Sequence, residues 1–185
     1  ERGVLENTWI CFTSDHGELM GDHHLYRKSL PYEGSSKVPL LLVPPGGSTD
    51  PKITGSLAEL RDIMPTLLDA AGLEVPPGLD GHSLLHHLND DGRVLVGEHP
   101  AHGQGVFWVV DRRWKYIWWS GDDREQLFDL SADPQELTDL AADATFSEAL
   151  RIHRDVLIDY LAGREDGHSD GERLLPGRPA RATLP

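Results

Sequence analysis

The first strong pattern in the chain is an apolar run at residues 8–13 that ends abruptly at polar residues. The run is rich in β-branched and aromatic side chains with little alternation, which is typical of a strand buried on both faces. Asp15 and His16 follow it directly. Ligands of open α/β sheets bind beyond the carboxyl ends of parallel strands. This position therefore predicts a metal site or a catalytic pair.

Two further patterns complete the first half of the chain. Residues 38–43 form a second apolar run, which the Pro/Gly cluster at 44–47 ends. Residues 63–71 are predicted to form a helix, with Asp62 as its N-terminal cap and Gly72 just after its end. The intervening segment 17–28 is polar and contains glycine, so we expect a loop there.

From residue 93 onward the pattern changes to short strands followed by one helix. A tight connection at 111–113 indicates an antiparallel hairpin, and Gly163 ends the predicted helix. Trp118 and Trp119 are adjacent in a strand, so they face opposite sides and pack rather than form one flat platform. Residues 164–185 offer little to bury, which predicts a mobile tail. The predicted strands are 93–97, 106–111, 114–119 and 126–130.

Composition excludes several classes of function. A formal net charge of −14 argues against sequence-independent binding to nucleic acid, because phosphates would be repelled. No apolar run approaches the roughly 20 residues needed to span a membrane. The single cysteine, Cys11, rules out an internal disulfide but does not distinguish a cytoplasmic from a periplasmic or secreted location.

Four blocks of the sequence resemble the sulfatase family of the alkaline-phosphatase-like superfamily, in the family's order. The segment TSDHGELMGDHHLYRKSLPYEGSSKVPLLLVPPG at 13–46 is similar to the late catalytic motif of that family. Similar blocks lie at 62–72, 79–84 and 127–140. The resemblance implies an α/β fold: the C-terminal part of a sulfatase catalytic domain at 1–88, then a small α+β subdomain at 89–163 with an antiparallel sheet and a packed helix. Residues 164–185 would form the flexible tail.

The resemblance also assigns candidate site residues. Asp15 and His16 match a pair that binds a divalent cation, which in this family is Ca²⁺; the imidazole keeps Mn²⁺, Zn²⁺ and Mg²⁺ open. Lys28 matches a lysine that contacts the sulfate oxygens, where its charge would stabilise the sulfuryl group and the departing oxygen. His23, and His99 with His102 in the predicted loop 97–103, are candidate substrate contacts.

The nucleophile of the family is not found here. Sulfatases use a formylglycine made within a Cys/Ser-x-Pro/Ala-x-Arg motif, and the residues after Cys11 lack both the Pro or Ala and the Arg. About seven residues precede the first strand, which is too few for the crossover that a parallel strand requires. We therefore expect this chain to be the C-terminal portion of a longer enzyme, whose formylglycine lies in the missing N-terminal part.

The sequence supports one main hypothesis on function and leaves two alternatives open. The parent enzyme would hydrolyse the sulfate ester of a small molecule or sugar, and this portion would be inactive without its N-terminal part. A phosphodiester or phosphonate-ester hydrolase of the same superfamily is one alternative, since it shares the Asp-His pair. The other alternative is a non-catalytic module that merely retains the fold.

Overall fold

A computed structural model describes residues 3–48, 54–86 and 92–179 of the chain. It divides the chain into two compact units. The first unit consists of Glu1–His16 and Val38–Arg93, and the second of Gly17–Lys37 and Val94–Pro185. These bounds differ from a division at residue 88, because the segment 17–37 groups with the second unit although it lies early in the chain.

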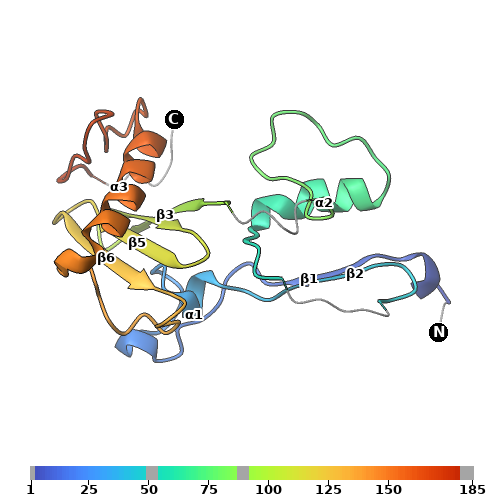
Figure 1. Cartoon of the computed structure of the whole chain (residues 1–185). Helices are drawn as coiled ribbons and strands as arrows, with labels where there is room; N and C mark the ends of the chain where they lie inside the picture. The colour runs from blue at the N-terminus through green and yellow to red at the C-terminus, as the bar shows by residue number, and fades with distance from the viewer. Residues whose placement is uncertain (1–2, 49–53, 87–91, 180–185) are drawn as a thin grey trace. The chain divides into compact units, whose positions relative to one another are not determined.

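The first unit contains a two-stranded antiparallel sheet (Figure 1). Its strands are β1, Ile10–Thr13, and β2, Leu40–Val43, with Phe12 opposite Leu41. We expected β1 to be a parallel strand buried on both faces, and this was wrong: Phe12 is 60% and Leu41 51% exposed. The sequence predicted where both strands lie but not how far they are buried. Burial depends on which segments cover each face of the two-stranded sheet.

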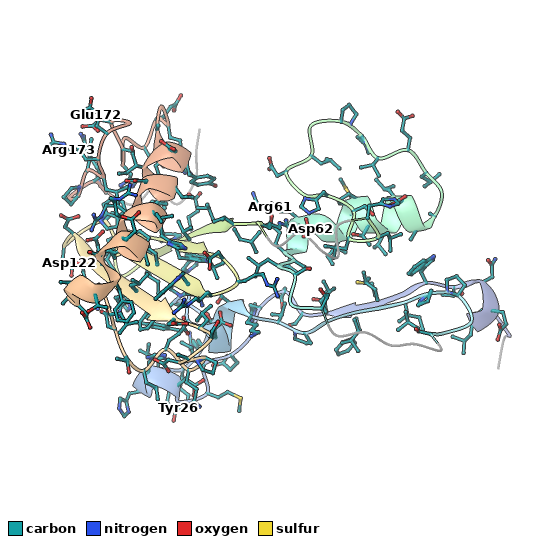
Figure 2. All side chains as sticks on the ribbon, in the orientation of Figure 1. Tyr26, Arg61, Asp62, Asp122, Glu172 and Arg173 are labelled. Carbon is teal, nitrogen blue, oxygen red and sulfur yellow. The ribbon has the colours of Figure 1, made fainter. Side chains whose placement is uncertain are left out.

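The helix of the first unit, α2, spans Ile63–Ala70, close to its predicted bounds. Gly72 has a φ of +68°, as expected for a glycine just beyond a helix C-terminus. Asp62, however, makes no capping bond to α2. Figure 2 labels it beside Arg61, at the start of the helix.

The carboxylate of Asp62 instead forms a buried network. Its side chain is fully buried, and both of its oxygens accept hydrogen bonds from Arg93, at 2.6 and 2.9 Å. It also accepts the backbone N–H groups of Glu59 and His82, at 2.9 and 3.0 Å. Burial raises the pKa of Asp62, but these hydrogen bonds outweigh it and lower the pKa. The network ties the start of α2 to segments up to 31 residues away.

The second unit is built on a four-stranded antiparallel sheet in the order β3-β4-β5-β6. The four predicted strands are confirmed, although β3 runs four residues past its predicted end and β6 begins two residues early. The turn between β4 and β5 is fixed by Asp111, whose carboxylate accepts the N–H groups of Arg113 and Trp114. The strands are β3 (Leu95–Ala101), β4 (Gln104–Val110), β5 (Trp114–Trp119) and β6 (Arg124–Asp129).

The two faces of this sheet are covered by different parts of the chain. Helix α3, Ser147–Leu161, lies across one face (Figure 1), where Trp118 packs with Leu157. The segment 17–37, which includes the short helix α1 (Glu33–Ser36), covers the other face and packs against Trp119. The prediction that the two tryptophans face opposite sides and pack in the core is therefore confirmed. Over the described residues, no helix has the length and apolar character needed to cross a bilayer.

The segment after α3 contributes two residues to the interior of the second unit. His168 is only 2% exposed, and its ring lies edge-on to Phe107 and Trp118, with centroids 4.9 and 5.9 Å away. The N–H of Gly177 donates to the carbonyl of Ser120 at 2.6 Å. The expectation that this segment buries almost nothing is therefore wrong for residues 168 and 169, because a histidine fills a gap between two core aromatics.

A partly buried ion pair joins α3 to the β4–β5 turn and predicts a pH dependence. Nε2 of His153 lies 3.1 Å from Oδ2 of Asp111, and its Nδ1 lies 2.8 Å from the carbonyl of Ala149. Burial lowers the pKa of His153, but these hydrogen bonds outweigh it and raise the pKa. Burial likewise raises the pKa of Asp111, but bonds from His153 and two backbone N–H groups lower it to about 2. Both shifts favour the charged pair.

We expect this pair to stabilise the second unit most between pH 4 and 6.5. The contribution of Asp111, about 2 kcal/mol, is present above its unfolded pKa of about 3.9 and is lost as the pH falls toward 2. The contribution of His153 is complete below about pH 6.5 and is lost as the pH rises through its raised pKa. Urea denaturation of His153→Gln at several pH values tests this. A variant whose stability loss is the same at pH 5.5 and pH 9 would contradict it.

Candidate active site

Asp15 and His16 lie just after β1, and their side chains converge. Oδ2 of Asp15 is 3.5 Å from Nε2 of His16, and the backbone N–H of His16 donates to Oδ1 of Asp15 at 3.0 Å. The hydroxyl of Ser14 bridges the turn by donating to the carbonyl of His16 at 2.7 Å. The Asp15 side chain is 81% and that of His16 36% exposed, so both are accessible to an ion from solvent.

This donor pair fits a divalent cation. Two ligand atoms 3.5 Å apart can both lie within about 2.0–2.6 Å of one ion. A carboxylate oxygen suits Ca²⁺ or Mg²⁺, whereas an imidazole nitrogen is more typical of Mn²⁺ or Zn²⁺. Within the described residues no group of three or more His, Cys, Asp or Glu side chains gathers in a metal-binding arrangement. Asp15 and His16 are therefore two candidate ligands, fewer than the coordination shell of such a cation needs.

Lys28 is exposed and belongs to the second unit, whereas Asp15 and His16 belong to the first. Its loop is held by internal backbone bonds, from Leu19 N–H to the Arg27 carbonyl at 3.0 Å and from Gly21 N–H to the Leu25 carbonyl at 2.8 Å. The Glu18 carboxylate accepts the N–H of Arg27. Hydrogen bonds within the loop therefore hold the residue that directly precedes Lys28.

Two of the predicted substrate-contacting histidines meet in one pocket of about 610 Å³. His23, from the segment 17–37, stacks on Tyr32 with ring centroids 3.9 Å apart and contributes one wall. His102 contributes another wall from the turn between β3 and β4. Lys28 is not among the pocket residues.

The loop expected at 97–103 is mostly strand. His99 lies within β3, opposite Val106, is exposed, and does not line the pocket. His102 and Gly103 form a two-residue turn with φ values of +52° and +80°. Such a turn suits the twist of a hairpin but usually carries Asn or Asp at its first position. His-Gly is a weak signal for this turn, which explains why the sequence did not reveal that β3 continues.

The pocket also contains residues that sequence reasoning missed. Trp119 forms part of its floor, and the guanidinium carbon of Arg124 lies 4.0 Å from the Trp119 ring centroid. These two residues face each other across the β5–β6 hairpin, where Trp119 pairs with Arg124. Pairing of these two positions in a hairpin is enough to bring a guanidinium onto an indole ring. An arginine five positions after a tryptophan at the end of a predicted strand was therefore the sequence signal for this contact.

Comparison with known proteins agrees with the fold and the motif. The family model for the C-terminal region of N-sulphoglucosamine sulphohydrolase matches residues 21–160. An arylsulfatase of Clostridium perfringens is 41% identical over 186 residues, which cover 97% of this chain and 39% of that protein. Arylsulfatase K of Bos taurus is 39% identical and is matched over 28% of its length. The chain therefore belongs to the sulfatase family and corresponds to the C-terminal region of its members.

Solved structures give the same fold. A 2-O GAG sulfatase has a TM-score of 0.76 at 30% identity, covering 84% of this chain and 36% of that one. A phosphonate monoester hydrolase of Agrobacterium radiobacter has a TM-score of 0.65 at 29% identity, covering 85% and 35%. The α/β fold of the alkaline-phosphatase-like superfamily is thus confirmed. The chain spans less than two fifths of the length of these relatives.

Proposed function

We propose that the complete protein hydrolyses a sulfate ester and that this chain supplies part of its metal site and one substrate-binding lysine. The convergence of Asp15 and His16 directly after β1, within the sulfatase-like segment 13–46, carries the proposal. The names of the relatives, arylsulfatase and 2-O GAG sulfatase, favour an aryl or sugar sulfate as substrate.

Each residue has a distinct role in this proposal. The carboxylate of Asp15 and the imidazole of His16 hold a divalent cation, which we propose is Ca²⁺; Mn²⁺, Zn²⁺ and Mg²⁺ are the alternatives. Such a cation polarises a substrate oxygen as a Lewis acid. The ammonium of Lys28 binds sulfate oxygens and balances the charge that develops on the departing oxygen. Cys11 lies half-buried in β1, outside the nucleophile motif of the family, and has no part in the chemistry.

A second candidate is hydrolysis of phosphonate or phosphate esters. It is favoured by the likeness to the phosphonate monoester hydrolase at 29% identity. A sulfatase should have the higher kcat/KM on an aryl sulfate, and a phosphonate hydrolase on an aryl phosphonate. The assay should use protein expressed from the complete natural reading frame. Absence of turnover on both, together with a reading frame that lacks a nucleophile motif, would favour a non-catalytic module.

Removing the Asp15 carboxylate should empty the metal site. In the complete protein, we expect Asp15→Ala to lower the bound divalent metal, measured by elemental analysis after gel filtration, by about tenfold or more, because even the loss of a group that only supports a ligand typically costs about 10–100-fold in metal affinity. The same variant should lose the melting-temperature increase that added Ca²⁺ gives the wild type. Glu172→Ala, which removes an exposed carboxylate from the second unit (Figure 2), is the matched control. It should retain both the bound metal and the melting-temperature increase with Ca²⁺. Unchanged metal content in Asp15→Ala would refute the assignment.

A further inference from the structure

The pocket of the second unit carries nitrogen-bearing side chains that the proposed hydrolysis does not use. Among its lining residues are three histidines and one arginine but no carboxylate. This is unusual for a chain with 31 acidic and 17 basic residues. Its volume of about 610 Å³ lies within the range of small-molecule sites, roughly 300–1,000 Å³. These four side chains are His23, His24, His102 and Arg124, and the amide of Gln104 and the hydroxyl of Tyr32 add further polar groups.

Arg124 is held in place without being neutralised. Its guanidinium stacks on Trp119, whose indole N–H donates to Gln126 at 3.1 Å and is thereby fixed. Within the described residues, no carboxylate forms an ion pair with Arg124, whereas Arg93 and Arg154 both pair with acids. A planar guanidinium fixed at one face keeps its N–H donors at its edge, where they suit a planar or tetrahedral oxyanion.

The backbone of the pocket histidines is strained. His23, His24 and His102 have φ values of +53°, +60° and +52°, in the left-handed region that favours glycine. A non-glycine residue there costs about 1–2 kcal/mol, and such residues cluster at ligand sites. Three histidines with left-handed backbone therefore present their side chains to one pocket.

The remaining wall of the pocket is apolar. Leu25, Leu30 and Leu137 lie beside the aromatic floor of Tyr32 and Trp119. Aliphatic and aromatic surfaces suit the C–H faces of a sugar ring, whereas a free inorganic anion would gain nothing from them. Gln104 adds an amide that can bind a hydroxyl group.

We propose that this pocket binds an acidic saccharide unit of the substrate, through a sulfate or carboxylate group held by Arg124 and His102. This inference rests on the proposed function and narrows its substrate class to polyanionic saccharides. The pocket then serves binding and not bond cleavage. Substrates that lack the acidic unit should not depend on it.

The experiment compares two substrates in the complete protein. For Arg124→Gln and His102→Asn, we expect kcat/KM on a sulfated uronate-containing oligosaccharide to fall by about tenfold or more, mainly through KM, because each variant loses a hydrogen bond to the anionic group of the ligand. Asn tolerates the left-handed backbone of position 102, so the turn is kept. Turnover of p-nitrophenyl sulfate should change less than about twofold. Arg173→Gln, an exposed arginine that does not line the pocket (Figure 2), is the control.

Calorimetric titration separates this inference from the proposed function. The probes are an unsaturated uronate–glucosamine disaccharide with and without sulfate groups, and a neutral disaccharide. Binding of an acidic probe that Arg124→Gln weakens supports the pocket even if the wild type hydrolyses no sulfate ester, and the two acidic probes show whether sulfate or carboxylate is recognised. Equal losses on both turnover substrates, equal binding of the neutral probe, or no effect of either variant would overturn the inference.

Discussion

Replacing Lys115 with methionine should destabilise the second unit by about 3–5 kcal/mol, because it would leave buried carboxylates without their cation. The Lys115 side chain is 1% exposed, and its ammonium lies 2.7 Å from Glu33 and 2.9 Å from Glu136. It also donates to the carbonyl of Pro31 at 2.8 Å. The methionine side chain fills similar space but can satisfy none of these groups.

The two acids respond differently to this environment. Burial raises the pKa of Glu33, but Lys115 and Lys37 outweigh it and lower the pKa. Burial also raises the pKa of Glu136, and there it prevails over the attraction of Lys115. The ammonium of Lys115 therefore favours the charged form of both carboxylates, against the effect of burial.

Urea denaturation followed by tryptophan fluorescence measures the loss, since Trp118 and Trp119 lie in the same sheet strand as Lys115. Lys37→Met is a matched control: Lys37 also pairs with Glu33, at 3.3 Å, but its side chain is 73% exposed. We expect this control to cost less than about 1 kcal/mol. If the two variants unfolded at the same urea concentration, the buried contacts of Lys115 with Glu33 and Glu136 would not stabilise the second unit more than the exposed contact of Lys37 does.

Removing the ammonium of Lys28 should have the largest effect on catalysis. In the complete protein, Lys28→Ala should lower kcat on an aryl sulfate by about 10²–10³-fold, the usual cost of losing a preorganised charge stabiliser. Because Lys28 is exposed, the unfolding free energy and the metal content should stay close to wild type.

Steady-state kinetics with Lys37→Ala as control completes this test, since Lys37 is another exposed lysine of the segment 17–37. A salt titration adds a second readout. The wild-type KM should rise with ionic strength more steeply than that of Lys28→Ala, because one attraction to the sulfate is missing in the variant. Normal turnover in Lys28→Ala would show that this residue does not contact the substrate.

The sequence predicted local elements well. The strands of the second unit follow from runs of aromatic and β-branched residues between turns, and the opposite facing of Trp118 and Trp119 follows from strand geometry alone. The end of α2 followed from Gly72, which has the positive φ that a helix terminus requires. In each case neighbouring residues determine the outcome.

The features that were missed depend on distant residues. Asp62 reads locally as a helix cap, but Arg93, 31 residues later, binds its carboxylate instead. The burial of Lys115 is invisible in a strand pattern, because its partner Glu33 lies 82 residues earlier. His168 looked like part of a polar tail and is buried by Phe107 and Trp118.

The candidate site was predicted, like the fold, only where it depends on neighbouring residues. Adjacency in a motif was enough to identify Asp15 and His16 as two converging donors. The pocket around His23 and His102 could not be assembled from the sequence, because its walls come from the segment 17–37, the β3–β4 turn and β6. Arg124 follows Trp119 by five positions, and the register of the β5–β6 hairpin brings the two side chains together.

Segment 17–37 covers a sheet that is made of later residues, so it can pack only after those residues have been synthesised. The hairpins of the sheet close over short loops and can form early, whereas Glu33 meets Glu136 across 103 residues. At about 5–20 residues per second, the segment waits at least about five seconds before its last partner emerges from the ribosome. During that interval Leu19, Leu30 and Tyr32 have no sheet to cover. Chaperones that act during synthesis should therefore bind the segment 17–37, whose apolar side chains stay uncovered until the sheet has formed.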